Sequence, residues 1–187
     1  MTTADETVLA ATRDWLVRAV IGLNLCPFAR AVHAGNRIRY AVSDARTPEA
    51  LLEALAAELR LLAAADERET ETTLLIHPQV LGDFPDYNDF LELAEALVVG
   101  LGYEGVLQVA SFHPQYQFEG TAADDISNFT NRSPFPMLHL LRESGIERAV
   151  AAHPDTTRIY ETNIETLRRL GRAGWEQLGV GPPAAKK

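Results

Sequence analysis

The chain has little of what marks several large classes of protein. Its 187 residues include one cysteine, so no intramolecular disulfide can form. No uncharged apolar run reaches the ~18 residues that a membrane-spanning helix needs. Residues 1–6 have neither the basic start nor the apolar stretch of a signal peptide. We therefore expect a soluble, cytoplasmic protein with no membrane partner.

Positive charge is also scarce. The chain has 17 Lys and Arg against 26 Asp and Glu, a net charge of −9 at pH 7. Nucleic-acid binding needs a basic surface, so nucleic acid is not an expected partner. The glycine-rich nucleotide motifs, the Gly-x-Ser-x-Gly elbow and the Cys-x-x-Cys or His-Glu-x-x-His metal spacings are missing. These absences argue against nucleotide binding and serine hydrolysis by the usual routes.

The apolar pattern, in contrast, is rich enough to predict a fold. Three runs of strand character, residues 38–42, 72–77 and 106–113, alternate with helical patterns over 47–61 and 86–101. The order β-α-β-α-β predicts an α/β fold with a small, mainly parallel sheet of about three strands, covered by helices. Further helices are expected over 3–20, over 133–142 and in a last segment that ends at Gly171. The alternative is a ferredoxin-like α+β sheet, if an unrecognised strand pairs between the three.

The predicted domain organisation is simple. Residues 1–175 should form a single α/β domain, because no linker divides the chain, and residues 176–187 should form a flexible tail. A long polar loop is expected over 114–132, between the third strand and the next helix. Loops of this length in compact domains are usually functional or disordered.

Two predicted strands end with the same phrase. His77-Pro-Gln follows the second strand and His113-Pro-Gln follows the third. Proline keeps the preceding residue extended and cannot extend a sheet ladder, so each imidazole should lie at a strand end. Ligands bind at the carboxyl ends of strands in α/β sheets, and neutral imidazole is both a general base and a metal ligand. We therefore take His77 and His113 as catalytic or metal-binding candidates, with caps on the strand ends as the alternative.

The loop after the third strand supplies further polar candidates. Gln115, Asn131 and Ser133 could bind a ligand, and Arg132 could assist catalysis by holding a negative charge. Ser133-Pro134 should open a helix, whose N-terminus with the adjacent guanidinium would favour a carboxylate or phosphate. The alternative is that Ser133 only caps that helix while Arg132 pairs with Asp124 or Asp125.

Cys26 follows the first helix in the segment Asn24-Leu-Cys-Pro-Phe28. With the two histidines it could bind zinc, iron or copper, and Cys-Pro also occurs in haem-responsive segments. A thiol becomes reactive when a cation, a histidine or a helix N-terminus lowers its pKa, whereas Cys26 follows a helix C-terminus. We place it at the rim of the predicted site and favour a packing role over a nucleophilic one.

Five segments together resemble an uncharacterised family, the domain of unknown function DUF 1415, known from bacteria and plants. They are residues 19–29, 74–80, 86–90, 108–118 and 128–139, and the resemblance extends from about Trp15 to Leu170. The resemblance implies family membership, and no activity, cofactor or catalytic residue comes with it.

From the residues, the leading hypothesis is an enzyme that acts on a small anionic metabolite. The hypothesis leaves open whether the enzyme uses a transition metal or haem iron bound by His77 or His113. The alternative is a non-catalytic protein that binds or senses such a ligand or haem. The substrate, the reaction and the oligomeric state do not follow from the sequence.

Overall fold

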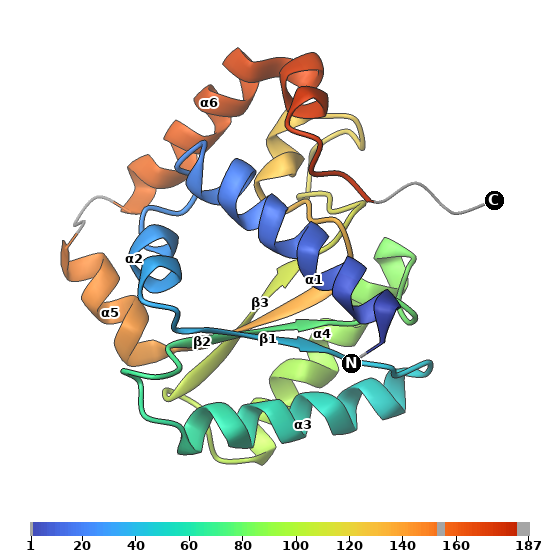
Figure 1. Ribbon diagram of the computed structural model, residues 1–187, viewed down its shortest axis with the longest axis vertical. Helices are drawn as coiled ribbons and strands as arrows, with labels where there is room; N and C mark the ends of the chain where they lie inside the picture. Colours follow the sequence, from blue (N-terminus) through green and yellow to red (C-terminus); the bar gives the residue numbers. More distant parts are fainter. Residues whose placement is uncertain (1, 153–155, 183–187) are drawn as a thin grey trace.

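A computed structural model describes residues 2–152 and 156–182 of the chain, and Figure 1 shows its layers. The helices are α1 (Thr3–Trp15), α2 (Ala29–Ala34), α3 (Pro48–Ala64), α4 (Phe84–Gly100), α5 (Glu143–Ala152) and α6 (Thr156–Gln177). A π-helical turn, η1 (Leu16–Ile21), continues α1, and a 3₁₀ turn, η2 (Ile126–Thr130), lies in the long loop. The strands are β1 (Ile38–Val42), β2 (Thr72–Ile76), β3 (Leu107–Phe112) and β4 (Met137–Arg142).

The four strands form one mixed sheet in the order β1-β2-β4-β3. Strand β1 pairs in parallel with β2, while β4 lies between β2 and β3 and runs antiparallel to both. The three strands expected from the sequence are present. The prediction of a mainly parallel, three-stranded sheet is wrong, because a fourth strand separates β2 from β3.

That fourth strand occupies the segment predicted as a helix over residues 133–142. Met137, Leu138 and Leu140 are fully buried, since β4 is central and covered on both faces. A short apolar run of this kind cannot be distinguished from a buried helix by its period. The predicted cap is also different: the Ser133 hydroxyl donates to the Phe135 carbonyl (2.7 Å) instead of opening a helix.

The mixed sheet meets one condition of the ferredoxin-like alternative, an unrecognised strand between the others. The element order differs, however, because this chain runs β-α-β-α-β-β where ferredoxin-like domains run β-α-β-β-α-β. The plain description is a mixed four-stranded α/β sheet with helices on both faces.

Side chains from the two sheet faces build two apolar cores. Leu74 and Ile76 of β2 pack with α1, η1 and α6 on one face, while Leu75 packs with α3 and α4 on the other. Figure 1 shows α3 and α4 below the sheet and α1 above it. The alternation follows from the strand geometry, which sends successive side chains to opposite faces. None of the described helices is long and apolar enough to span a bilayer.

The C-terminal part continues beyond the predicted domain end at residue 175. Gly171, at φ +65°, bends α6 where the sequence predicts the end of the last helix. After the bend Trp175 is buried, and Val180 also packs into the core under α1. Of the predicted tail, residues 183–187 lie outside the part of the chain that the structure describes.

The central position of β4 makes its side chains strong determinants of stability. Leu140→Ala should lower the free energy of unfolding by about 2–5 kcal/mol, because it leaves a cavity between fully covered layers. Leu61→Ala, at a side chain that is 51% exposed on α3, should change it by less than about 0.5 kcal/mol. Urea denaturation measures both. Equal effects of the two variants would contradict the central position of β4.

Candidate functional site

The two strand-end histidines lie at the same edge of the sheet. Since β2 and β3 both run antiparallel to β4, their carboxyl ends point in one direction. The ring of Tyr87 on α4 packs against both imidazoles, with centroid distances of 5.8 Å to His77 and 5.0 Å to His113. Both histidines are completely buried. The structure therefore brings the two leading candidates together around one tyrosine.

His77 has one free ring nitrogen. Its Nδ1 lies 3.0 Å from the Val80 carbonyl oxygen, which can only accept, so Nδ1 carries the proton. The other nitrogen, Nε2, is buried and has no hydrogen-bond partner among the described residues. Burial lowers the pKa of His77 to about 4, and the nearby His113 adds to this effect. At neutral pH, His77 is therefore an uncharged imidazole with an unused lone pair on Nε2.

His113 is held at both ring nitrogens. Its Nε2 donates to the Leu81 carbonyl (3.1 Å), and its Nδ1 accepts the backbone N–H of Gln115 (3.0 Å). Burial also lowers the pKa of His113, so this ring is neutral as well. Coordination of a metal or transfer of a proton by His113 would require one of these hydrogen bonds to break.

Tyr87 joins strands β3 and β4 at this edge of the sheet. Its hydroxyl donates to the Met137 carbonyl of β4 (2.9 Å) and accepts the Phe112 N–H of β3 (3.1 Å). Burial raises the pKa of the hydroxyl well above its usual range, so it stays protonated. Sequence reasoning missed this residue. The available signal was its spacing of three residues before Phe90, which puts it on the buried stripe of α4.

The segment between β2 and α4 supplies the carbonyls that hold both imidazoles. Val80 binds His77 and Leu81 binds His113, so consecutive peptide groups fix two rings. Leu81 has a positive φ of +55°, which is rare outside glycine and costs about 1–3 kcal/mol. Such strain is concentrated at functional sites and switch regions. No sequence signal indicated it.

The other polar candidates of the long loop mainly hold the backbone in place. Asn131 donates its side-chain N–H to the Ser111 carbonyl (3.1 Å), and its own carbonyl accepts the His113 N–H (3.2 Å). Ser133 binds Phe135, as described above, and Gln115 contacts His113 through its backbone. The helix N-terminus predicted after Ser133 is wrong, because β4 follows.

Arg132 binds carbonyls instead of the expected carboxylates. Its Nε donates to the Tyr116 carbonyl (3.2 Å) and its Nη2 to the Ala123 carbonyl (2.5 Å). Asp125 is engaged elsewhere, since its carboxylate accepts the Ser127 N–H and hydroxyl at 2.8 Å each. Arg132 thus ties the loop together at the edge of the sheet that carries His113.

Cys26 lies in the turn after η1, where it is half-buried against the core under α1. The adjacent Leu25 carbonyl accepts a hydrogen bond from Asn163 of α6 (2.9 Å). Among the described residues, Cys26 forms no hydrogen bond with either strand-end imidazole, and no group of three His, Cys, Asp or Glu side chains is placed to hold a metal ion. The geometry is that of a packing residue.

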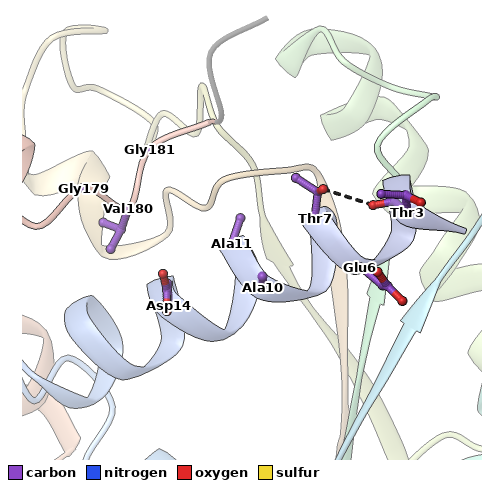
Figure 2. Close-up of a pocket in the computed structure, with 9 residues that line it drawn as sticks. All are labelled: Thr3, Glu6, Thr7, Ala10, Ala11, Asp14, Gly179, Val180 and Gly181. Atoms are coloured by element: carbon purple, nitrogen blue, oxygen red, sulfur yellow. Dashed lines mark hydrogen bonds between the residues drawn. The ribbon is translucent and has the colours of Figure 1, made fainter. Parts of the chain in front are cut away.

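The groove drawn in Figure 2 is elsewhere on the molecule. It has a volume of about 490 Å³ and lies between α1 and residues 179–181. Glu6 and Asp14 give its wall on α1 an acidic character, and none of the predicted site residues contributes to it. The strand-end histidines are buried and take no part in this groove.

Comparison with known proteins gives a family for this chain. The model of a family described as "Protein of unknown function (DUF1415)" matches residues 7–177, from within α1 to the end of α6. The chain belongs to this family. Searches of curated proteins and of solved structures found no match. The DUF1415 assignment confirms the resemblance noted in the sequence and carries no activity with it.

The low pKa of His77 predicts a pH-dependent loss of stability. Between pH 6.5 and about 4, the unfolded chain binds a proton at His77 that the folded protein does not bind. The free energy of unfolding should therefore fall with decreasing pH in this window, by up to about 3 kcal/mol from this group. His77→Asn, whose amide N–H can still donate to Val80, should lack this part of the loss.

The measurement is urea denaturation of wild type and His77→Asn at pH 7.5 and 4.5. The difference between the two proteins isolates His77 from His139, whose pKa burial also lowers to about 4. Parallel losses in both proteins would show that His77 is not buried in its neutral form.

The two hydrogen bonds of the Tyr87 hydroxyl should contribute more to the free energy of unfolding than an ordinary surface hydrogen bond does. Tyr87→Phe leaves the Phe112 N–H and the Met137 carbonyl without this partner, at a cost of about 1–3 kcal/mol. Tyr103→Phe is the matched control, because the Tyr103 hydroxyl forms no hydrogen bond with the described residues. Thermal and urea melts compare the two variants. A Tyr87→Phe protein as stable as the control would contradict the bridging role.

Proposed function

We propose that the DUF1415 chain is an enzyme that acts on a small anionic molecule, with His77 as its general base. The observation that carries the proposal is the buried Nε2 of His77, an unprotonated nitrogen without a hydrogen-bond partner in the described part of the chain. Leaving a buried polar atom unsatisfied costs about 1–3 kcal/mol, so such atoms are rare in native proteins. A ligand that donates a hydrogen bond or a proton to Nε2 would remove that cost.

The surroundings of His77 suit a base. The Val80 carbonyl fixes the tautomer and the ring orientation, as the third member of a base-orienting arrangement does in known enzymes. The ring is neutral at physiological pH, so its lone pair is available, but its low pKa makes it an effective base only where a bound ligand stabilises the imidazolium. The stacked Tyr87 ring holds it from one side. Stabilisation of the resulting imidazolium would come from the negative charge of the bound substrate.

Access to the base would require the covering segment to move. Val80 and Leu81 lie between β2 and α4, and Leu81 already carries backbone strain. Movement of Leu81 away from His113, with the Val80 carbonyl kept on Nδ1 of His77, would release the strain, keep the orientation of His77 and free Nε2–H of His113 to act as a donor. In this proposal His113 polarises the substrate while His77 accepts its proton. Lid motions of this kind occur in many enzymes.

The positive charge of Arg132 would give the site its preference for an anionic substrate. Its backbone neighbour Asn131 binds His113, and its guanidinium contacts the Tyr116 carbonyl, so it belongs to the same edge of the sheet. One nitrogen, Nη1, forms no hydrogen bond within the described part of the chain. A cytoplasmic location, which the single cysteine favours, fits an enzyme of small-molecule metabolism.

Two other functions stay open for test. An exposed lone pair on His77 could ligate a transition metal or haem iron, because neutral imidazole is a common metal ligand. A protein that binds a small anion without converting it would use the same residues. Stoichiometric Fe, Cu or Zn that is lost in His77→Asn would indicate the metal form, and a Soret band lost on the same change would indicate haem.

The test of the proposed activity compares wild type with His77→Asn on a defined mixture of phosphorylated and carboxylated metabolites. Mass spectrometry follows the consumption of each compound. Removal of a general base should slow turnover 10²- to 10⁴-fold. His33→Asn, on the short helix α2, is the matched control and should keep the wild-type rate. Binding without consumption would favour the non-catalytic alternative, and equal rates in all three proteins would refute the role of His77.

A further inference from the structure

Two arginines far apart in the sequence stand over one aromatic ring. The guanidinium carbon of Arg132 lies 4.4 Å from the ring centre of Phe129, and that of Arg172 lies 5.7 Å from the same centre. Trp175 packs edge-on against Phe129 at 5.1 Å and fixes the ring. The turn η2, the segment before β4 and helix α6 therefore bring two positive charges together.

Neither arginine is neutralised by the protein. Within the described ranges, no carboxylate lies within ion-pair distance of Arg132 or Arg172, whereas Arg37 pairs with Glu71 and Arg39 with Glu58. The chain has 26 acidic residues to 17 basic ones, so carboxylates are plentiful. Burial and then the charge of Arg172 lower the pKa of Arg132, which shows that the two cations destabilise each other.

Asp125, an acid of the same loop as Arg132, does not relieve this repulsion. It uses its carboxylate to hold the start of η2 through Ser127. Its charge interacts instead with Arg168, one turn before Arg172 on α6. The carboxylate of Asp125 therefore does not neutralise the positive charges beside Phe129.

Arg132 is also held rigidly. Two carbonyls fix its guanidinium, and its own carbonyl accepts the indole N–H of Trp15 at 2.8 Å. This arrangement leaves Nη1 of Arg132 and the whole guanidinium of exposed Arg172 available to a ligand. Because the Arg132 guanidinium is already fixed, less conformational entropy is lost when an anion binds than if both guanidinium groups were free.

We propose that Arg132 and Arg172, whose guanidinium groups both stand over the ring of Phe129, form a binding site for a small multivalent oxyanion of the phosphate class. Two cations without a carboxylate partner match an anion that carries at least two negative charges. Guanidinium groups bind phosphate oxygens with paired, charge-assisted hydrogen bonds. The inference rests on the proposed function and deepens it, since it names the anionic part of the substrate as a phosphate or diphosphate group.

Inorganic pyrophosphate is the probe. Isothermal titration at low ionic strength should detect binding to wild type, and Arg172→Gln should weaken it about tenfold or more, as expected for the loss of a hydrogen bond to a charged group. Arg169→Gln is the matched control, because Arg169 is an exposed neighbour on α6 that does not stand over Phe129. Added salt should weaken binding to wild type.

A second measurement uses the repulsion itself. Without anion, Arg172→Gln should melt at or above the temperature of wild type, because one of two repelling charges is gone. Pyrophosphate should raise the melting temperature of wild type and Arg169→Gln but not of Arg172→Gln. Equal weakening in both arginine variants would mean diffuse attraction to α6, and absence of binding to wild type at millimolar pyrophosphate would refute the site.

The outcome is separable from the catalytic proposal. His77→Asn should bind pyrophosphate as wild type does, because Nε2 of His77 is not part of the arginine pair. If pyrophosphate binds but His77 has no effect on turnover, the anion site stands and the role of His77 fails. If His77 governs turnover but pyrophosphate does not bind, the base stands and this inference fails.

Discussion

The pairing of β4 with β2 and β3 is the constraint on which the rest of the structure depends. Strands β2 and β3 run in the same direction, with β4 between them, so their carboxyl ends lie at one edge of the sheet. These ends are two strand spacings apart, roughly 10 Å. The ring of Tyr87 packs against both His77 and His113 at this edge, and its hydroxyl binds both β3 and β4.

The same insertion determines the protonation states. His77 and His113 are both buried at this edge, and burial keeps both rings neutral. Their tautomers then follow from the two carbonyls of Val80 and Leu81. His113 has partners on both nitrogens while His77 has one, so the two copies of His-Pro-Gln are chemically different despite their identical sequence. The difference lies in the tertiary contacts of the covering segment.

The sequence predicts the parts of this arrangement that depend on local pattern. Residues 38–42, 72–77 and 106–113 were recognisable as strands, and the proline after each histidine correctly marks the end of β2 and β3. The strand β4 was not recognisable, because its apolar run has no period of two and Ser133-Pro134 imitates a helix start. The spacing of Tyr87 marks it as a buried position of α4. Its two hydrogen bonds, the strained Leu81 and the proximity of Arg132 to Arg172 depend on contacts between distant segments, which a single sequence does not contain.

Two unfavourable features occur within five residues of each other, the unpaired Nε2 of His77 and the left-handed backbone of Leu81. Each costs free energy in the closed structure, by about 1–3 kcal/mol. Both costs would disappear in one event, the opening of the segment between β2 and α4 onto a ligand that donates to Nε2. In the proposed function, a ligand on Nε2 of His77 would therefore be favoured by the relief of both costs. The segment between β2 and α4, and not the sheet, is the part of the fold where binding of such a ligand should act.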